Sequence, residues 1–95
     1  MSLFLVRIEL HGKPDYSHPS YEKLHAAMEK EGFTRTINPD AKWYKLNSGS
    51  YRIDCDYPLE KVMEMAKKAA DSVDTNNSVL AGIVKRALFA GPKAA

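Results

Sequence analysis

Three histidines lie within the first 25 residues, at positions where an imidazole could act on a substrate. His11 ends an expected strand, His18 begins an expected helix, and His25 follows Tyr21 by four residues on the apolar side of that helix. An imidazole titrates near neutral pH, so it can move a proton when it lies within hydrogen-bond reach of a substrate. We predict that His11 and His18 converge as a general base and acid. His25 is interpreted as a half-buried packing residue.

Three arginines, Arg7, Arg35 and Arg52, are the candidates for contact with an RNA backbone. Arg7 and Arg52 alternate with apolar residues in two expected strands, which turns both side chains to the open face of a sheet. Glu9 and Asp54 share that face, and opposite charges on neighbouring strands form pairs worth about 0.2 to 1 kcal/mol. The open face therefore has three interpretations: contact with a phosphate backbone, contact with another subunit, or pairing among its own charges.

No pattern in the sequence predicts a metal or a cofactor. Glu9 and His11 point to one face of a strand but lack a third ligand nearby in the sequence. There is no glycine-rich phosphate loop, no G-x-S-x-G turn and no C-x-x-C pair. The one cysteine, Cys55, alternates with Tyr51 and Ile53 on the expected buried face of a strand. We interpret Cys55 as a small core residue and predict no metal and no cofactor.

The composition limits the partners that the chain can have. Fourteen Lys and Arg against twelve Asp and Glu give a net charge of +2, well short of the excess that marks a strong nucleic-acid binder. RNA binding is therefore allowed but not indicated by charge. No apolar run approaches the roughly 18 residues of a membrane span, and the first ten residues lack a basic start and a cleavage site. We expect a cytoplasmic protein with no membrane segment.

The spacing of apolar residues changes period in a fixed order along the chain. Alternation predicts strands at 4–10, 33–37, 51–55 and 78–84, and helical spacing places Tyr21, Leu24 and Met28 on one helix and residues 59–73 on another. The order β-α-β-β-α-β predicts an α+β, ferredoxin-like fold, with one antiparallel sheet and both helices on one face. The expected common core contains Val6, Ile8, Leu24, Met28, Ile53, Val62, Met63 and Ala66.

Polar and special residues predict where the helices begin and end. Ser17 is expected to cap the first helix with Pro19 in its first turn, and Gly32 is expected to end it in a left-handed conformation. Asp56-Tyr57-Pro58 should start the second helix by the same logic. Residues 1–95 are expected to form a single domain in which 85–95 is a partly packed tail.

The stretch Tyr21 to Ile37, together with the opening Leu3 to His11, the Leu46 turn and the strand from Tyr51, resembles the GhoS family of endoribonuclease antitoxins. The resemblance is specific in the segment at 24–37, LHAAMEKEGFTRTI. The resemblance covers about the first 85 residues in element order, and it implies bacterial type V toxin-antitoxin function by sequence-selective cleavage of a toxin messenger RNA. The family is similar in fold to the CRISPR-associated spacer-acquisition nucleases, which carry a metal-binding aspartate at the end of the first strand. This chain has Glu9-Leu10-His11 there, so a two-metal mechanism is not implied.

Two hypotheses from different classes remain open. In the first, the chain is a metal-independent endoribonuclease in which His11 and His18 move protons while Arg7 and Arg35 hold the phosphate. In the second, it is a non-catalytic module that binds a protein partner or a second copy through the sheet face or an edge strand.

We also expect a homodimer. Leu3 and Leu5 alternate onto the face opposite the helices, where they would otherwise meet water.

Overall fold

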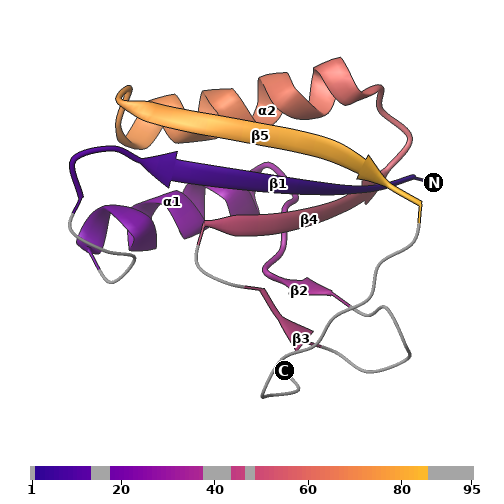
Figure 1. Cartoon of the computed structure of the whole chain (residues 1–95), viewed down its shortest axis with the longest axis horizontal. Coiled ribbons are helices and arrows are strands. Elements are labelled where there is room, and N and C mark those ends of the chain that lie inside the picture. The colour runs from indigo at the N-terminus through magenta and orange to yellow at the C-terminus, as the bar shows by residue number, and fades with distance from the viewer. Residues whose placement is uncertain (1, 14–17, 38–43, 47–48, 86–95) are drawn as a thin grey trace.

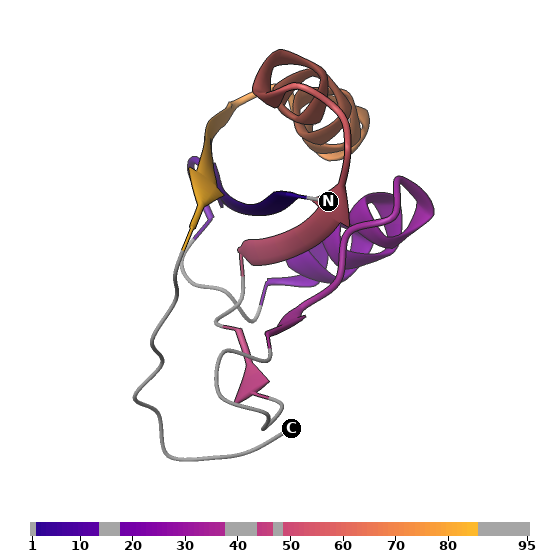
Figure 2. The same cartoon turned by 90° about the vertical axis from the view of Figure 1, so that its right-hand side faces the viewer.

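Two helices pack against one face of an antiparallel sheet (Figures 1 and 2). The computed structural model describes residues 2–13, 18–37, 44–46 and 49–85. In chain order the elements are β1 (Ser2–Leu10), α1 (Pro19–Lys30), β2 (Thr36–Ile37), β3 (Tyr44–Lys45), β4 (Ser50–Cys55), α2 (Leu59–Val73) and β5 (Asn77–Val84). This arrangement confirms the α+β class and is the one expected of a ferredoxin-like fold.

Strand β1 lies at the centre of the sheet, in the order β4-β1-β5, and it is antiparallel to both neighbours. Among the described residues, the sheet continues beyond β4 only as an isolated bridge, in which Thr34 and Arg52 exchange backbone hydrogen bonds of 2.8 and 2.7 Å. The chain then leaves β4, because β2 pairs with β3 and the Leu46 N–H donates to the carbonyl of Arg35 at 2.6 Å. The predicted strand at 33–37 is therefore reduced to Thr36–Ile37 and the bridge.

Alternation along β1 divides its side chains between the two faces. Phe4, Val6, Ile8 and Leu10 are each at most 2% exposed under the helices. Arg7 and its alternating neighbours lie on the opposite, open face, and Arg7 is exposed. The strand phase predicted from the sequence is confirmed, since a shift of one residue would have exchanged the two sets.

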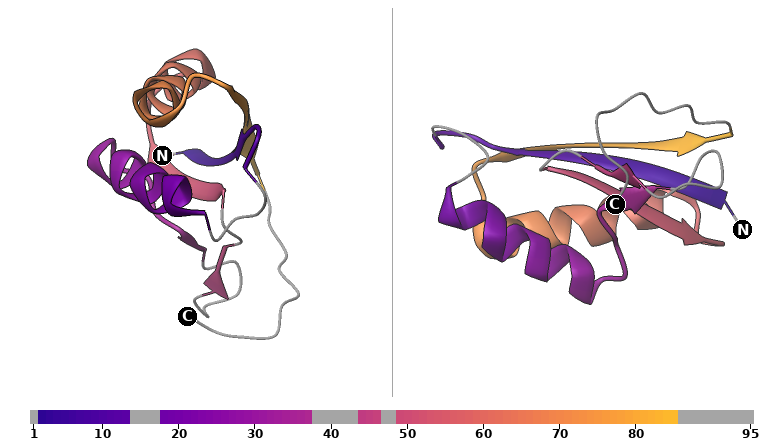
Figure 3. Two further views of the ribbon diagram at one scale, coloured as in Figure 1. Left: turned by 90° about the vertical axis from the view of Figure 1, so that its left-hand side faces the viewer. Right: turned by 90° about the horizontal axis from the view of Figure 1, so that it is seen from below.

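Each helix buries one stripe against this face, and the helices also contact each other (Figure 3). The buried side chains are Tyr21, Leu24 and Met28 from α1 and Val62, Ala66, Ala69 and Ala70 from α2. Met63 was predicted in the core, but it is only half-buried and lies outside the core cluster. Successive residues of a helix are about 100° apart, so Met63 lies beside the stripe that Val62 and Ala66 define. Met65 packs against the core instead.

The ends of the helices agree only in part with the prediction. Gly32 follows α1 with a φ of 97°, the left-handed conformation expected of it. The N-cap of α1 is His18, whose Nδ1 accepts a hydrogen bond from the Ser20 N–H at 3.1 Å, and Pro19 occupies the first turn. Ser17, the predicted cap, lies outside the described residues. In α2 the N-cap is Pro58 itself, which makes no side-chain capping hydrogen bond, whereas Pro19 lies inside the first turn of α1, so the predicted similarity between the two starts is wrong.

The C-terminal tail and the absence of a membrane segment were also predicted from the sequence. Residues 86–95 lie outside it, so most of the predicted tail cannot be compared. Neither helix within the described ranges has the length and apolar character needed to cross a membrane.

Because Met28 lies on a buried helix stripe and Met63 lies beside one, replacing them with alanine should cost very different amounts of stability. Met28→Ala should lower the free energy of unfolding by about 2 to 5 kcal/mol, because Met28 is fully buried and its removal leaves a cavity. Met63→Ala should lower it by about 1 kcal/mol or less, since the side chain is partly solvated. Urea unfolding followed by circular dichroism measures both values. Equal losses would contradict the observed phase of α2.

Candidate functional site

His25 and Tyr51 form a hydrogen-bonded pair between α1 and β4. The Nδ1 of His25 lies 2.6 Å from the Oη of Tyr51, with the two rings tilted by 57°. Tyr51 is 1% exposed, because the alternation of β4 turns it under the helices. His25 is half-buried, as the sequence predicted, since it follows the fully buried Leu24 at the border of the buried stripe. The pair joins residues 26 positions apart in the sequence.

Burial sets the charge state of both groups. Burial lowers the pKa of His25 below 6.5, the positive charges of Arg35 and Lys45 act in the same direction, and Glu22 opposes them. Burial raises the pKa of Tyr51, and Arg35 opposes that change. At neutral pH the imidazole is therefore uncharged and the phenol keeps its proton.

A neutral imidazole beside a phenol can share the hydrogen bond in two ways. Tyr51 can donate to Nδ1 of His25, or the Nδ1–H can donate to the phenol oxygen. In the second tautomer the Nε2 lone pair accepts a proton, as a general base requires. A base held in orientation by a third group is a recurring arrangement in enzyme sites.

A cavity of about 320 Å³ lies beside this pair, and its lining includes His25, Tyr51, Arg35 and Glu29. Arg35 reaches the cavity because it lies between the bridge residue Thr34 and the start of β2. An arginine fork, a neutral imidazole and hydroxyl groups are the donors and acceptors that bind a phosphate. The cavity thus combines a cation with a potential base.

Arg52 lies next to the same edge of the sheet. Its Nη2 donates to the Oγ1 of Thr34 at 3.2 Å, and Thr34 also lines the cavity. Arg52 forms an ion pair with Asp54, two residues along the same strand. Arg52 and Asp54 therefore pair with each other, which is one of the three interpretations of the open face. The pair lies within one strand, whereas the sequence predicted pairs between neighbouring strands.

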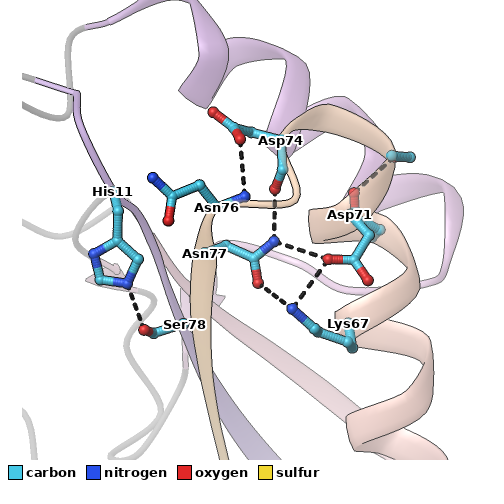
Figure 4. Close-up of polar contacts among 9 residues, drawn as sticks. His11, Lys67, Asp71, Asp74, Asn76, Asn77 and Ser78 are labelled. Carbon is cyan, nitrogen blue, oxygen red and sulfur yellow. Dashed lines mark hydrogen bonds and ion pairs between the residues drawn. The ribbon is translucent and has the colours of Figure 1, made fainter.

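His11 lies at the far end of β1, close to β5 (Figure 4). Its Nε2 is 2.5 Å from the Oγ of Ser78, and its backbone N–H donates to the carbonyl of Asn76 at 2.9 Å. Ser78 belongs to β5, and Asn76 lies in the connection between α2 and β5. In this position His11 links the end of the central strand to an edge strand.

A polar network holds that connection in place (Figure 4). The side chain of Asn77 donates to Asp71 at 3.0 Å and accepts from the Nζ of Lys67 at 2.8 Å. The hydrogen bond from Asn77 and then that from Lys67 lower the pKa of Asp71 below its usual value. The backbone N–H of Asn76, followed by Lys13, lowers the pKa of Asp74. These groups fix a turn, and His11 borders them.

The two histidines predicted to be catalytic engage different elements. His18 caps its own helix through Nδ1, whereas His11 contacts β5. Within the described part of the chain, no hydrogen bond joins the two imidazoles. The proposal that they act together stays a prediction. The sequence did not reveal the His25–Tyr51 pair, because no local spacing signals a contact between a helix and a distant strand.

The open face of the sheet carries a second depression of about 380 Å³. Its lining is mainly apolar and includes Leu5, Leu46, Leu80 and Val84, with Arg7 as its charged member. Arg7 is exposed, as predicted, and lies opposite Leu80 of β5. At this depression the open face is therefore an apolar surface around a single arginine, and not a continuous basic track.

Among the residues with described positions, no three His, Cys, Asp or Glu side chains gather closely enough to hold a metal ion. Cys55 is a half-buried free thiol packed against the core, which agrees with its predicted role.

Comparisons with known protein families, with curated proteins and with solved structures gave no match for this chain. The resemblance to the GhoS family stays a prediction.

The lowered pKa of His25 predicts a pH dependence of stability. The unfolded chain, with a histidine pKa of 6.5, binds more protons than the folded chain between that value and the lowered pKa. The free energy of unfolding should therefore be highest above pH 6.5 and decrease as the pH falls through this window. Denaturant titrations at several pH values measure it, and His25→Gln should remove the His25 share of the slope. Identical slopes for the parent and the variant would contradict the burial of His25. The carboxyl groups of Asp71 and Asp74 act in a separate window, below 3.8.

Proposed function

We propose that this chain is a metal-independent endoribonuclease of the toxin-antitoxin type, with its site at the cavity beside α1. The observation that carries the proposal is the 2.6 Å contact between His25 and Tyr51 at a cavity that Arg35 also lines. The resemblance of the segment at 24–37 to an endoribonuclease family supports it independently, and both His25 and Arg35 belong to that segment. The proposal moves the base from His11 or His18 to His25.

His25 serves as the general base in this proposal. Its Nε2 takes the proton of a ribose 2′-hydroxyl, the 2′-oxygen forms a bond to the adjacent phosphorus, and the bond from phosphorus to the 5′-oxygen breaks. The 5′-oxygen leaves with a proton from water, the hydroxide formed takes the proton back from the His25 imidazolium, and the products are a 2′,3′-cyclic phosphate and a 5′-hydroxyl. A lowered pKa keeps the base unprotonated at neutral pH. Tyr51 is a positioning residue, since it fixes the imidazole through Nδ1.

Arg35 holds the phosphate as negative charge develops on its oxygens. A guanidinium binds two phosphate oxygens at once, and its charge stabilises the transition state more than the ground state. Arg52, beside Thr34 at the same edge, is suited to a neighbouring phosphate of the strand. Arg7, on the open face, would contact a phosphate further along the RNA strand. The net charge of +2 supports modest, salt-dependent affinity, and messenger RNA as substrate places the protein in the cytoplasm.

Cleavage of labelled single-stranded RNA in the presence of EDTA tests this proposal. The parent chain should cut RNA, leave a 2′,3′-cyclic phosphate and leave 2′-O-methyl RNA intact. His25→Gln should lower the rate by about a hundredfold or more, the size of a general-base contribution. Arg35→Ala should lower it by a similar factor, whereas Lys61→Ala, which removes an exposed positive charge on α2, should change it little. The rate of the parent should fall in acid with an apparent pKa below 6.5.

Two further variants separate this site from the one predicted from the sequence. If His11→Ala or His18→Ala abolishes cleavage while His25→Gln cuts normally, the active site lies at the strand end and helix start and the cavity proposal is wrong. If the parent cuts no RNA of any sequence offered, the enzyme proposal fails as a whole. Circular dichroism of each variant excludes unfolding as the cause of a lost rate.

A further inference from the structure

Strand β5 is an edge strand without the features that usually prevent edge pairing. It is eight residues long, Asn77–Val84, and contains no charge and no proline. Its one strand neighbour in the described structure is β1. Natural edge strands commonly carry lysine, proline or a bulge, because their unpaired backbone groups otherwise recruit another strand. Leu80 is 70% exposed and Ile83 is 51% exposed on this edge.

The opposite edge of the sheet differs. There Thr34 pairs with Arg52 of β4, and the chain continues into the β2–β3 hairpin. The sheet therefore has one long open edge among the described elements. If two copies pair through this edge, the assembly stops at a dimer, because neither copy has a second open edge of the same kind among its described elements.

We infer that β5 pairs antiparallel with β5 of a second copy, with a two-fold axis at Ala81. In this register Leu80 lies opposite Gly82 of the second copy on the open face, and Val79 lies opposite Ile83 of the second copy on the helix face. No charged residue of β5 meets a like charge, since the strand has none. The strand is thus complementary to itself, as a two-fold interface requires.

The space above Gly82 supports this register. A Cβ built at Gly82 would meet no atom within 4 Å, so the surface beside it is open. Leu80 of the second copy would fill that space. The depression of about 380 Å³ is lined by Leu80, Gly82 and Val84 and continues to Leu5 on β1, so pairing would extend this apolar surface across the axis. Dimerisation would turn two three-stranded sheets into one continuous sheet.

Light scattering and sedimentation at micromolar concentrations test the dimer. We expect a mass twice the 10.6 kDa of one chain. Leu80→Lys should convert the dimer to a folded monomer and raise the dissociation constant at least tenfold, because it places a charge on each side of the axis, opposite Gly82 of the second copy. Tyr57→Lys is the matched control, since Tyr57 is 50% exposed but belongs to the connection between β4 and α2 and not to β5; it should leave the dimer intact. A monomeric parent, or a dimer that Leu80→Lys leaves unchanged, would overturn the inference.

Cysteine cross-linking tests the register. In a Cys55→Ser background, Ala81→Cys should form a disulfide-linked dimer under mild oxidation, because residue 81 faces its own copy across the axis. Val79→Cys should not, since it faces Ile83 of the second copy. Cross-linking at 79 but not at 81 would show that the two-fold axis lies elsewhere. This outcome is independent of RNA cleavage, so the dimer and the endoribonuclease proposal stand or fall separately.

Discussion

The burial of one face of β1 is the interaction on which the rest of the structure depends. Phe4, Val6, Ile8 and Leu10 lose nearly all contact with water, and burying each such side chain stabilises the fold by about 1.5 to 3 kcal/mol. Both helices must cover this face, and β4 and β5 must flank the strand to satisfy its backbone hydrogen bonds. Every other feature of the molecule is positioned relative to this central strand.

The same arrangement gives the two edges of the sheet different properties. At the β4 edge, α1 lies over Tyr51, so His25 meets a phenol in a desolvated setting and Arg35 follows at the bridge. At the β5 edge, α2 covers one face, β1 is the one strand neighbour among the described elements, and Leu80 lies in water on the open face. Proton chemistry fits the first edge because burial keeps an imidazole neutral there. Association fits the second because, in the described part of the chain, no strand pairs with the outer side of β5.

The spacing of apolar residues predicted the features that depend on nearby residues in the sequence, and it did not predict contacts between distant elements. The alternation of β1 and the stripes of both helices follow from side-chain geometry, so the fold class and most of the core were predictable. Met63 was misplaced because its position at the border of a stripe depends on the rotation of α2 as a whole. The sequence predicted Ser17 as the cap of α1, whereas in the structure the N-cap is His18, whose imidazole accepts a hydrogen bond from the Ser20 N–H. The contact between His25 and Tyr51 depends on how a helix packs on a strand far along the chain, and no local pattern encodes that distance.

We propose that an RNA phosphate binds in the cavity that His25 and Arg35 both line. Nuclear magnetic resonance of the labelled parent chain, titrated with a 2′-O-methyl RNA that cannot be cut, tests this claim most directly. We expect saturable shifts of the His25 ring and the Arg35 Nε–H resonances, while the ring of His11, which contacts Ser78 of β5, stays unchanged. Shifts confined to His11 or His18, or no shift at any RNA concentration, would contradict it.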